Sequence, residues 1–232
     1  MDDPKQVEAT FSEKTLLFMD ELPFAFDPDT YFPKEKFSFT REDLDLPQEA
    51  KVICCGNSFV VKANEAFLSL LVRLLTKDPQ AYLILMPLSG DQNVFLYHLY
   101  RAFLKEKVGL DRLRFIQPSS REKQYALLGL ADLYLDCFPY SGANSLFDPL
   151  WCGVPVLCLQ SEHKMRFRQG SAILQDMGLD LFVALRLEEL EEKALSFLKA
   201  PPKEALGPKR VLSSSAFDGR AAKKIAQLLE SL

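Results

Sequence analysis

The stretch ADLYLDCFPYSGANSLFDPLWCGVPVLCL, residues 131–159, decides the fold. It contains two short apolar runs, 133–135 and 154–159, which predict two buried β-strands. A Ser-Gly pair interrupts the apolar pattern between them, and Asn144 or Ser145 can cap a helix that follows. The stretch therefore predicts a strand, a tight polar loop, a short helix and a second strand. Loop amides that precede a helix are well placed to bind phosphate.

The same alternation of strands and helices continues on both sides of this stretch. Further strands are predicted at 52–55, 82–86, 113–116 and 181–184, and further helices at about 64–75, 91–106, 119–130, 165–177 and 187–199. Strands separated by helices of this length imply parallel pairing through right-handed crossovers. We therefore expect an α/β fold with a doubly wound, mostly parallel, Rossmann-like sheet that binds ligands at the carboxyl ends of its strands.

Several helices carry signals for where they begin or end. Asn64 can cap a helix with one apolar face, formed by Phe67, Leu70, Leu71, Leu74 and Leu75. Ser119 and Glu122 have the spacing of a capping box. Gly178 is a natural residue to end the helix at 165–177.

Composition and charge exclude several classes of protein. With 232 residues, 48% of them hydrophobic and 26% charged, the chain is long enough for one full core. A net charge of −4 gives no basic stripe for nucleic acid, and no apolar run approaches the ~20 residues of a membrane span. The N-terminus shows no secretory signal and the five cysteines form no CxxC pair, so we expect a cytoplasmic protein with reduced thiols.

The two ends of the chain differ from the segment between them. Residues 1–50 carry Pro23, Pro28, Pro33 and Pro47 among aromatic and acidic residues, which predicts a helix near 12–19 and then an extended, linker-like segment crossing a surface. Residues 51–200 form the predicted sheet domain. Residues 201–232 begin irregularly and end in a helix that we expect to pack back on the core through Ile225, Leu228, Leu229 and Leu232.

Three phrases of the sequence resemble one enzyme family. They are FSEKTLLFMDELPFAF at 11–26, LDCFPYSGANSLFDPLWCGVPVL at 135–157 and GSAILQDMGLDLFVA at 170–184, and they resemble the O-linked N-acetylglucosamine transferase and SPINDLY-like glycosyltransferases. Members of that family have a GT-B fold, in which two Rossmann-like lobes face each other and the C-terminal lobe holds the nucleotide-sugar. The resemblance implies that this chain is the donor-binding lobe, preceded at 1–50 by a remnant of the other lobe.

The resemblance also assigns roles around the first and third predicted strands. It implies that Lys62 is the catalytic lysine that contacts the donor diphosphate, and it places Asn57 in the preceding polar loop. A cation there would stabilise the charge that grows on the leaving diphosphate. Arg121 falls on a ribose-contacting position, and Gln124 on a base-contacting position. Both are equally suited to be polar residues in the first turn of a helix.

The remaining donor-binding residues follow the strand at 133–135. Asn144 and Ser145 occupy two of the family's His-Thr-Thr positions in the loop of Gly142, and can donate hydrogen bonds to phosphate. Ala143 stands at the third and has no polar side chain. Asp148 matches the family's ribose-binding acid, although an acid in a first helical turn also suits the helix dipole.

The function implied by the resemblance is transfer of a sugar, N-acetylglucosamine, from a UDP-linked donor to Ser or Thr hydroxyls of a protein. Neither a metal nor another cofactor is expected. The partners are then the nucleotide-sugar and a protein acceptor or a separate acceptor lobe. The chain can equally be a fragment, one subunit of a split enzyme, or a non-catalytic nucleotide-sugar-binding or interaction module. An unrelated GT-B epimerase is a further alternative.

Overall fold

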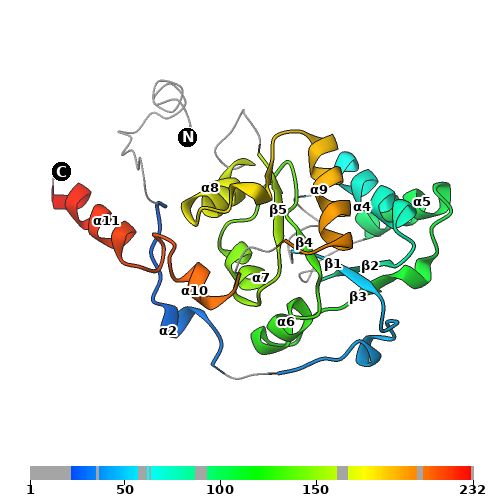
Figure 1. The fold of residues 1–232 in the computed structure, drawn as a ribbon, viewed down its shortest axis with the longest axis horizontal. Coiled ribbons are helices and arrows are strands. Elements are labelled where there is room, and N and C mark those ends of the chain that lie inside the picture. The colour runs from blue at the N-terminus through cyan, green and yellow to red at the C-terminus, as the bar shows by residue number, and fades with distance from the viewer. Residues whose placement is uncertain are drawn as a thin grey trace.

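A sheet of parallel strands lies in the middle of the molecule, in the order β3-β2-β1-β4-β5-β6 (Figure 1). The computed structural model describes residues 22–34, 37–56, 62, 64–86, 93–160, 167–202 and 206–230. The strands are β1 (Lys51–Cys55), β2 (Ala81–Leu85), β3 (Leu113–Phe115), β4 (Leu133–Leu135), β5 (Val156–Leu159) and β6 (Val183–Ala184). The predicted doubly wound parallel α/β sheet is confirmed.

Helices cover both faces of this sheet (Figure 1). One layer contains α4 (Glu65–Lys77), which packs against both α5 (Asn93–Lys105) and α9 (Leu187–Lys199). The opposite face carries α6 (Arg121–Leu128) and α7 (Phe147–Trp151), which contact each other. The next helix, α8 (Gln169–Asp176), follows β5 and packs against it. The short helix α10 (Pro208–Val211) packs on α7.

Helix α4 shows how the sequence pattern produces this packing. The side-chain Oδ1 of Asn64 accepts a hydrogen bond from the backbone N of Phe67 at 2.9 Å, as predicted for the N-cap. The predicted apolar face is fully buried and comprises Phe67, Leu70, Leu71, Leu74 and Leu75. Burial of each such side chain contributes about 1.5–3 kcal/mol, so this face ties α4 firmly to the sheet.

Two local predictions were wrong. The cap of α6 is Ser120, whose Oγ accepts from the backbone N of Lys123 at 3.3 Å, and not Ser119. Glu122 gave Ser119 the capping-box spacing, but a serine at either position can cap a helix, and α6 begins one residue later than predicted. The strand predicted at 181–184 is shorter, because residues 180–182 form a 3₁₀ turn and only β6 pairs with β5. Leu181 is 45% exposed in that turn.

The N-terminal segment packs on the sheet domain in the part that the structure describes. We call residues 22–34 the strap; it contains the short helix α2 (Pro28–Tyr31). The backbone N of Phe26 donates to the carbonyl O of Ala216 at 2.8 Å, and the ring of Phe32 stacks on Trp151 of α7 with centroids 3.5 Å apart. The strap is thus joined to both α7 and the C-terminal segment. The helix predicted at 12–19 lies outside the described residues.

The predicted C-terminal helix is α11 (Arg220–Glu230). Among its described residues only Ala221 is buried, and Leu229 is 61% exposed. Leu232 lies outside the described residues, as do the predicted helix starts near 91 and 165.

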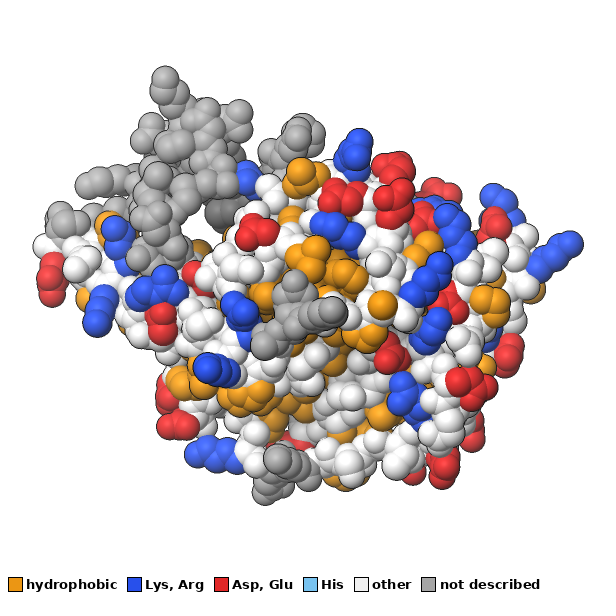
Figure 2. Space-filling view, viewed as in Figure 1, with side chains coloured by type: hydrophobic (Ala, Val, Ile, Leu, Met, Phe, Trp, Pro, Cys, Tyr) orange, Lys and Arg blue, Asp and Glu red, His pale blue; other side chains and the backbone are white. Residues whose placement is uncertain are grey.

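Surface charge and helix length bear on two expectations from the composition, the lack of a basic stripe and the lack of a membrane span. On the face seen in Figure 2, acidic and basic side chains are interspersed. In the described part of the chain, no helix has the length and apolarity that spanning a membrane requires.

The chain reverses its winding direction between β1 and β4. These strands are neighbours in the sheet, with Cys55 opposite Leu135, although they are far apart in sequence. The crossovers that leave them run to opposite sides, so a crevice opens beyond their carboxyl ends. Gly56 and Asp136 are the first residues past those ends. In open α/β sheets this switch point is where ligands bind.

Candidate functional site

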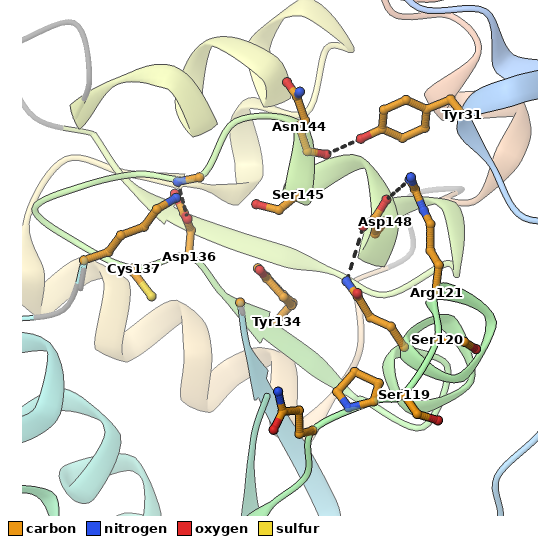
Figure 3. A pocket seen from close by; sticks show the side chains of 16 residues that line it. Tyr31, Ser119, Ser120, Arg121, Tyr134, Asp136, Cys137, Asn144, Ser145 and Asp148 are labelled. Atoms are coloured by element: carbon orange, nitrogen blue, oxygen red, sulfur yellow. Dashed lines mark hydrogen bonds and ion pairs between the residues drawn. The ribbon is translucent and has the colours of Figure 1, made fainter. Parts of the chain in front are cut away.

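A cavity of about 560 Å³ opens at this switch point. Its walls come from the end of β1, the segment between β3 and α6, α6 itself, and the loop and turn that follow β4 (Figure 3). Further wall residues are Lys62, which precedes α4, Asp148 of α7 and Tyr31 of the strap. The sheet thus brings segments that are distant in sequence around a single hollow.

Most of the predicted site residues meet in this cavity. Its lining includes Lys62, Arg121, Gln124, Gly142, Asn144, Ser145 and Asp148. The eighth predicted residue, Asn57, lies outside the described residues.

The carboxylate of Asp148 is the centre of one wall. Only 6% exposed, it accepts hydrogen bonds from Nη2 of Arg121 at 3.2 Å and from Nε2 of Gln124 at 3.4 Å (Figure 3). It also accepts one from the Tyr125 hydroxyl at 2.6 Å. Burial raises the pKa of this carboxyl, while the Tyr125 hydroxyl and the Arg121 charge oppose the rise. Asp148 therefore has a role beyond a favourable interaction with a helix dipole. Its carboxylate accepts hydrogen bonds from three side chains of α6 at the cavity edge.

The guanidinium group of Arg121 lies between two aromatic rings. Its central carbon is 4.7 Å from the ring centroid of Tyr31 and 5.7 Å from that of Tyr125. Burial raises the pKa of both phenols, and the nearby carboxylate of Asp148 adds to the rise. Both phenols therefore stay protonated at neutral pH and can donate hydrogen bonds. A planar cation stacked in this way is well suited to hold its orientation.

The loop after β4 is fixed by a second buried carboxylate, Asp136. Its Oδ1 accepts from the backbone N of Gly142 at 2.7 Å, and its Oδ2 from the Ser141 hydroxyl at 2.5 Å and from Cys158 Sγ at 3.4 Å. Ser141 Oγ in turn accepts from the backbone N of Gly170 at 2.8 Å. Burial raises the pKa of Asp136, against the effect of these donors. Asp136 thus ties the loop to β5 and to the start of α8.

Close packing around Asp136 explains one glycine. A Cβ at Gly170 would lie 2.6 Å from Ser141 Oγ and 2.7 Å from both Asp136 Oδ2 and Cys158 Sγ. The absence of a side chain at residue 170 lets the backbone of α8 approach the loop.

The turn after this loop differs from the predicted helix cap. Residues 144–146 form a 3₁₀ turn that leads directly into α7, and neither Asn144 nor Ser145 caps the helix. Both line the cavity instead, where their side chains are available to a ligand (Figure 3). Because α7 has only five residues, its dipole would contribute little to phosphate binding. Side chains would therefore contribute more to such binding than the helix end expected from the sequence.

A positive charge faces the same loop from the other side of the cavity. The Nζ of Lys62 lies 3.5 Å from the carbonyl O of Ser141 and 5.3 Å from the ring centroid of Tyr140. Lys62 and Arg121 therefore place two cations on the cavity wall, next to hydroxyl and amide donors. Such a set suits an anionic ligand with a diol, since phosphate oxygens accept hydrogen bonds and Asp148 can accept them from hydroxyls.

Sequence reasoning missed several lining residues. Tyr134 is 3% exposed, yet its side chain reaches the cavity from the middle of β4. A tyrosine between two leucines of a buried strand was a usable signal, as was an acid, Asp136, at the strand's end. Nothing in the local sequence pattern around Tyr31 indicated that this residue reaches the cavity.

The raised pKa of Asp148 predicts how stability depends on pH. Relative to Asp148→Asn, the wild-type protein should lose unfolding free energy as the pH rises from about 4, because the unfolded chain ionises near 3.9 while the folded carboxyl holds its proton to higher pH. The difference should level off above the folded pKa. Chemical denaturation at a series of pH values measures it, and the contribution of Asp136, being common to both proteins, cancels. A difference that moves in favour of the wild type with rising pH would contradict the prediction.

Fold and cavity together define the class of protein. A parallel sheet with strand order 3-2-1-4-5-6 and a cavity at its switch point is a Rossmann-like lobe. The family model described as glycosyl transferase family 41 matches residues 28–203. This chain belongs to that family.

Two curated relatives show the extent of the similarity. The chain is 28% identical over 166 residues to a probable UDP-N-acetylglucosamine–peptide N-acetylglucosaminyltransferase, SEC, of Arabidopsis thaliana. It is 26% identical over 161 residues to the UDP-N-acetylglucosamine–peptide N-acetylglucosaminyltransferase of Caenorhabditis elegans. These matches cover 70% and 68% of this chain but only 16% and 13% of the relatives. The chain therefore corresponds to a small part of each.

Solved structures agree. A variant of O-GlcNAc transferase from Thermobaculum terrenum superposes with a TM-score of 0.64 at 26% identity, over 78% of this chain and 36% of that one. Anabaena HepE, solved with UDP and glucose, superposes with a TM-score of 0.57 at 18% identity, over 90% of this chain and 56% of that one, and shows the shared fold. The GT-B lobe expected from the sequence is confirmed.

Proposed function

We propose that this chain is the donor-binding lobe of a protein glycosyltransferase and that its cavity holds a nucleoside diphosphate sugar. The observation that carries the proposal is the buried carboxylate of Asp148 on the wall of a cavity that also contains Lys62 and Arg121. A carboxylate would repel phosphate but accepts well from vicinal hydroxyls, so it suits the ribose end. The cations and the Asn144 and Ser145 side chains suit the diphosphate.

In the proposed reaction, an acceptor hydroxyl attacks the anomeric carbon of the donor sugar. A new bond forms between that carbon and the hydroxyl oxygen, whose proton passes to solvent, while the bond to the terminal phosphate oxygen breaks and negative charge grows on the leaving diphosphate. Lys62 would stabilise this charge from across the loop of Ser141. The acceptor, and the lobe that positions it, would come from outside the described residues. No step requires a metal ion in this proposal.

The base of the nucleotide follows from the relatives rather than from the cavity. Both curated relatives are described as using UDP-N-acetylglucosamine, so we propose UDP as the nucleotide and N-acetylglucosamine as the sugar. The chain's own groups are less selective, because Gln124, which falls on the base-contacting position, donates to Asp148.

Ligand-induced stabilisation tests the proposal. Thermal unfolding of the full chain should be measured with UDP, GDP, their sugars and, as a control, AMP. We expect UDP and UDP-N-acetylglucosamine to stabilise most, by about 2.7 kcal/mol at 100 times the Kd. If none of these nucleotides stabilises the fold, the donor-lobe proposal fails and an interaction module becomes the better explanation.

A nucleotide-binding protein without transfer activity is a second candidate. The observation that favours it is Ala143, which puts a methyl group beside two polar loop residues at the cavity edge. Transfer of radiolabelled sugar to peptide acceptors, with and without a candidate acceptor lobe, separates the two candidates. Binding without transfer in every combination would support the second.

A further inference from the structure

Tyr31 links the strap to two separate parts of the cavity. Its hydroxyl donates a hydrogen bond to the backbone carbonyl of Asn144 at 2.7 Å (Figure 3). The face of its ring lies against the guanidinium group of Arg121, with 4.7 Å between the central carbon and the ring centroid. Tyr31, Arg121 and Asn144 all line the cavity. One strap residue thus contacts both the polar turn after β4 and the cation on α6.

The strap holds this tyrosine firmly. Its ring packs against those of Phe26, Phe32, Phe147 and Phe217, with centroids 4.8, 4.8, 6.2 and 5.3 Å away. Asp27 caps α2 by accepting from the backbone N of Asp29 at 3.0 Å. The backbone N of Leu22 also donates to Ser215 Oγ at 2.9 Å. The position of Tyr31 is therefore set by tertiary packing and not by a free side-chain rotation.

The two contacts of Tyr31 act on different ligand groups of the proposed site. The hydrogen bond to Asn144 fixes the backbone of the 3₁₀ turn, which directs the Asn144 and Ser145 side chains at the diphosphate. The ring contact holds the guanidinium of Arg121 where its Nη2 reaches Asp148 at 3.2 Å, at the ribose end. Since Arg121 is 44% exposed, without the ring its side chain would have more freedom to turn into solvent.

We propose that Tyr31 is a positioning residue of the nucleotide site, so that the strap supplies part of the site along with the Rossmann-like sheet. This inference rests on the proposed function, and it identifies the ligand class as a nucleoside diphosphate that contacts Arg121 and the Asn144 turn together. Loss of Tyr31 should therefore weaken nucleotide binding even where the fold is intact.

Calorimetric titration of the full chain with UDP tests this positioning role. Tyr31→Phe removes only the hydrogen bond to Asn144 and should raise the Kd about 5-fold. Tyr31→Leu also removes the ring contact with Arg121 and should raise the Kd about 20-fold. The matched control is Phe24→Leu, since Phe24 packs on Phe26 and Phe147 in the same strap but does not line the cavity. This control should bind UDP like the wild type.

A double-mutant cycle shows whether Tyr31 acts through Arg121. In an Arg121→Gln background, Tyr31→Leu should lose affinity by only about 5-fold, because the contact between the two residues is already absent. Wild-type affinity in Tyr31→Leu, an equal loss in Phe24→Leu, or fully additive effects in the cycle would each overturn the positioning role while leaving the proposed function standing. If the wild type itself fails to bind UDP, the proposed function falls and this inference with it.

Discussion

Replacing Asp136 by alanine is expected to lower the free energy of unfolding by about 3–5 kcal/mol. The carboxylate is 4% exposed and accepts from the backbone N of Gly142 and the hydroxyl of Ser141, both of which would lose this buried acceptor. The loop after β4 would also lose its tie to β5 through Cys158. Because this loop forms one wall of the cavity, nucleotide binding should fall together with stability.

Urea denaturation of the full chain measures this loss. Asp132→Ala is the matched control, since Asp132 precedes the same strand and also accepts from a backbone N, that of Val52 at 2.7 Å. Its side chain is 35% exposed, so water can replace the lost partner and the cost should be about 1–2 kcal/mol. Equal costs for the two variants would show that the buried network adds nothing beyond one hydrogen bond.

Replacing Asp148 by asparagine is expected to weaken nucleotide binding by about 10- to 150-fold. The substitution keeps the size of the side chain but removes the charge that Arg121 and the Tyr125 hydroxyl contact. Hydrogen bonds to a charged group contribute about 1.5–3 kcal/mol, which corresponds to a loss of this size. The amide would also turn a donor group toward Arg121 or toward the ribose hydroxyls.

Titration with UDP measures this loss, and Asp132→Asn is again the control. Both aspartates pair with an arginine Nη2 at 3.2 Å: Asp148 of α7 with Arg121, and Asp132, which precedes β4, with Arg41. Only Asp148 lines the cavity. If Asp148→Asn binds UDP within about 3-fold of the wild type, the ribose role of this residue is wrong.

The parts of the fold that could be predicted are those that depend on short-range pattern. The spacing of apolar residues after Asn64 was sufficient to predict both the cap and the buried face of α4. Residues three and four apart lie on the same face of a helix, whatever the rest of the chain does. Prediction failed where the capping-box spacing pointed to a neighbour of the true cap: Ser119 has Glu122 three residues later, but Ser120 caps α6. The predicted length of the last strand was wrong for a related reason. A short edge strand such as β6 has too few apolar residues to show where it begins.

The candidate site was predicted only in part, because some of its residues reach the cavity through contacts between distant segments of the chain. Arg121, Gln124 and Asp148 were found through the resemblance, and the structure places them in hydrogen-bond contact. Tyr31 could not be found from its neighbours in the sequence, since its role depends on a contact with Asn144, 113 residues away. An acid at the end of β4 was a usable signal for Asp136, but its partners Gly142, Ser141 and Cys158 are set by the tertiary fold and not by the local pattern.

The packing of the strap determines where the chain could be shortened. A truncated protein that starts at Lys51, where a Rossmann fold would by itself begin, lacks Phe26 and Phe32. The faces of Phe147 and Trp151 that these rings cover would then meet water, on a helix that borders the cavity. Such a shortened protein would have an apolar, aggregation-prone patch next to an incomplete ligand site. Soluble expression of this lobe therefore depends on keeping the strap attached.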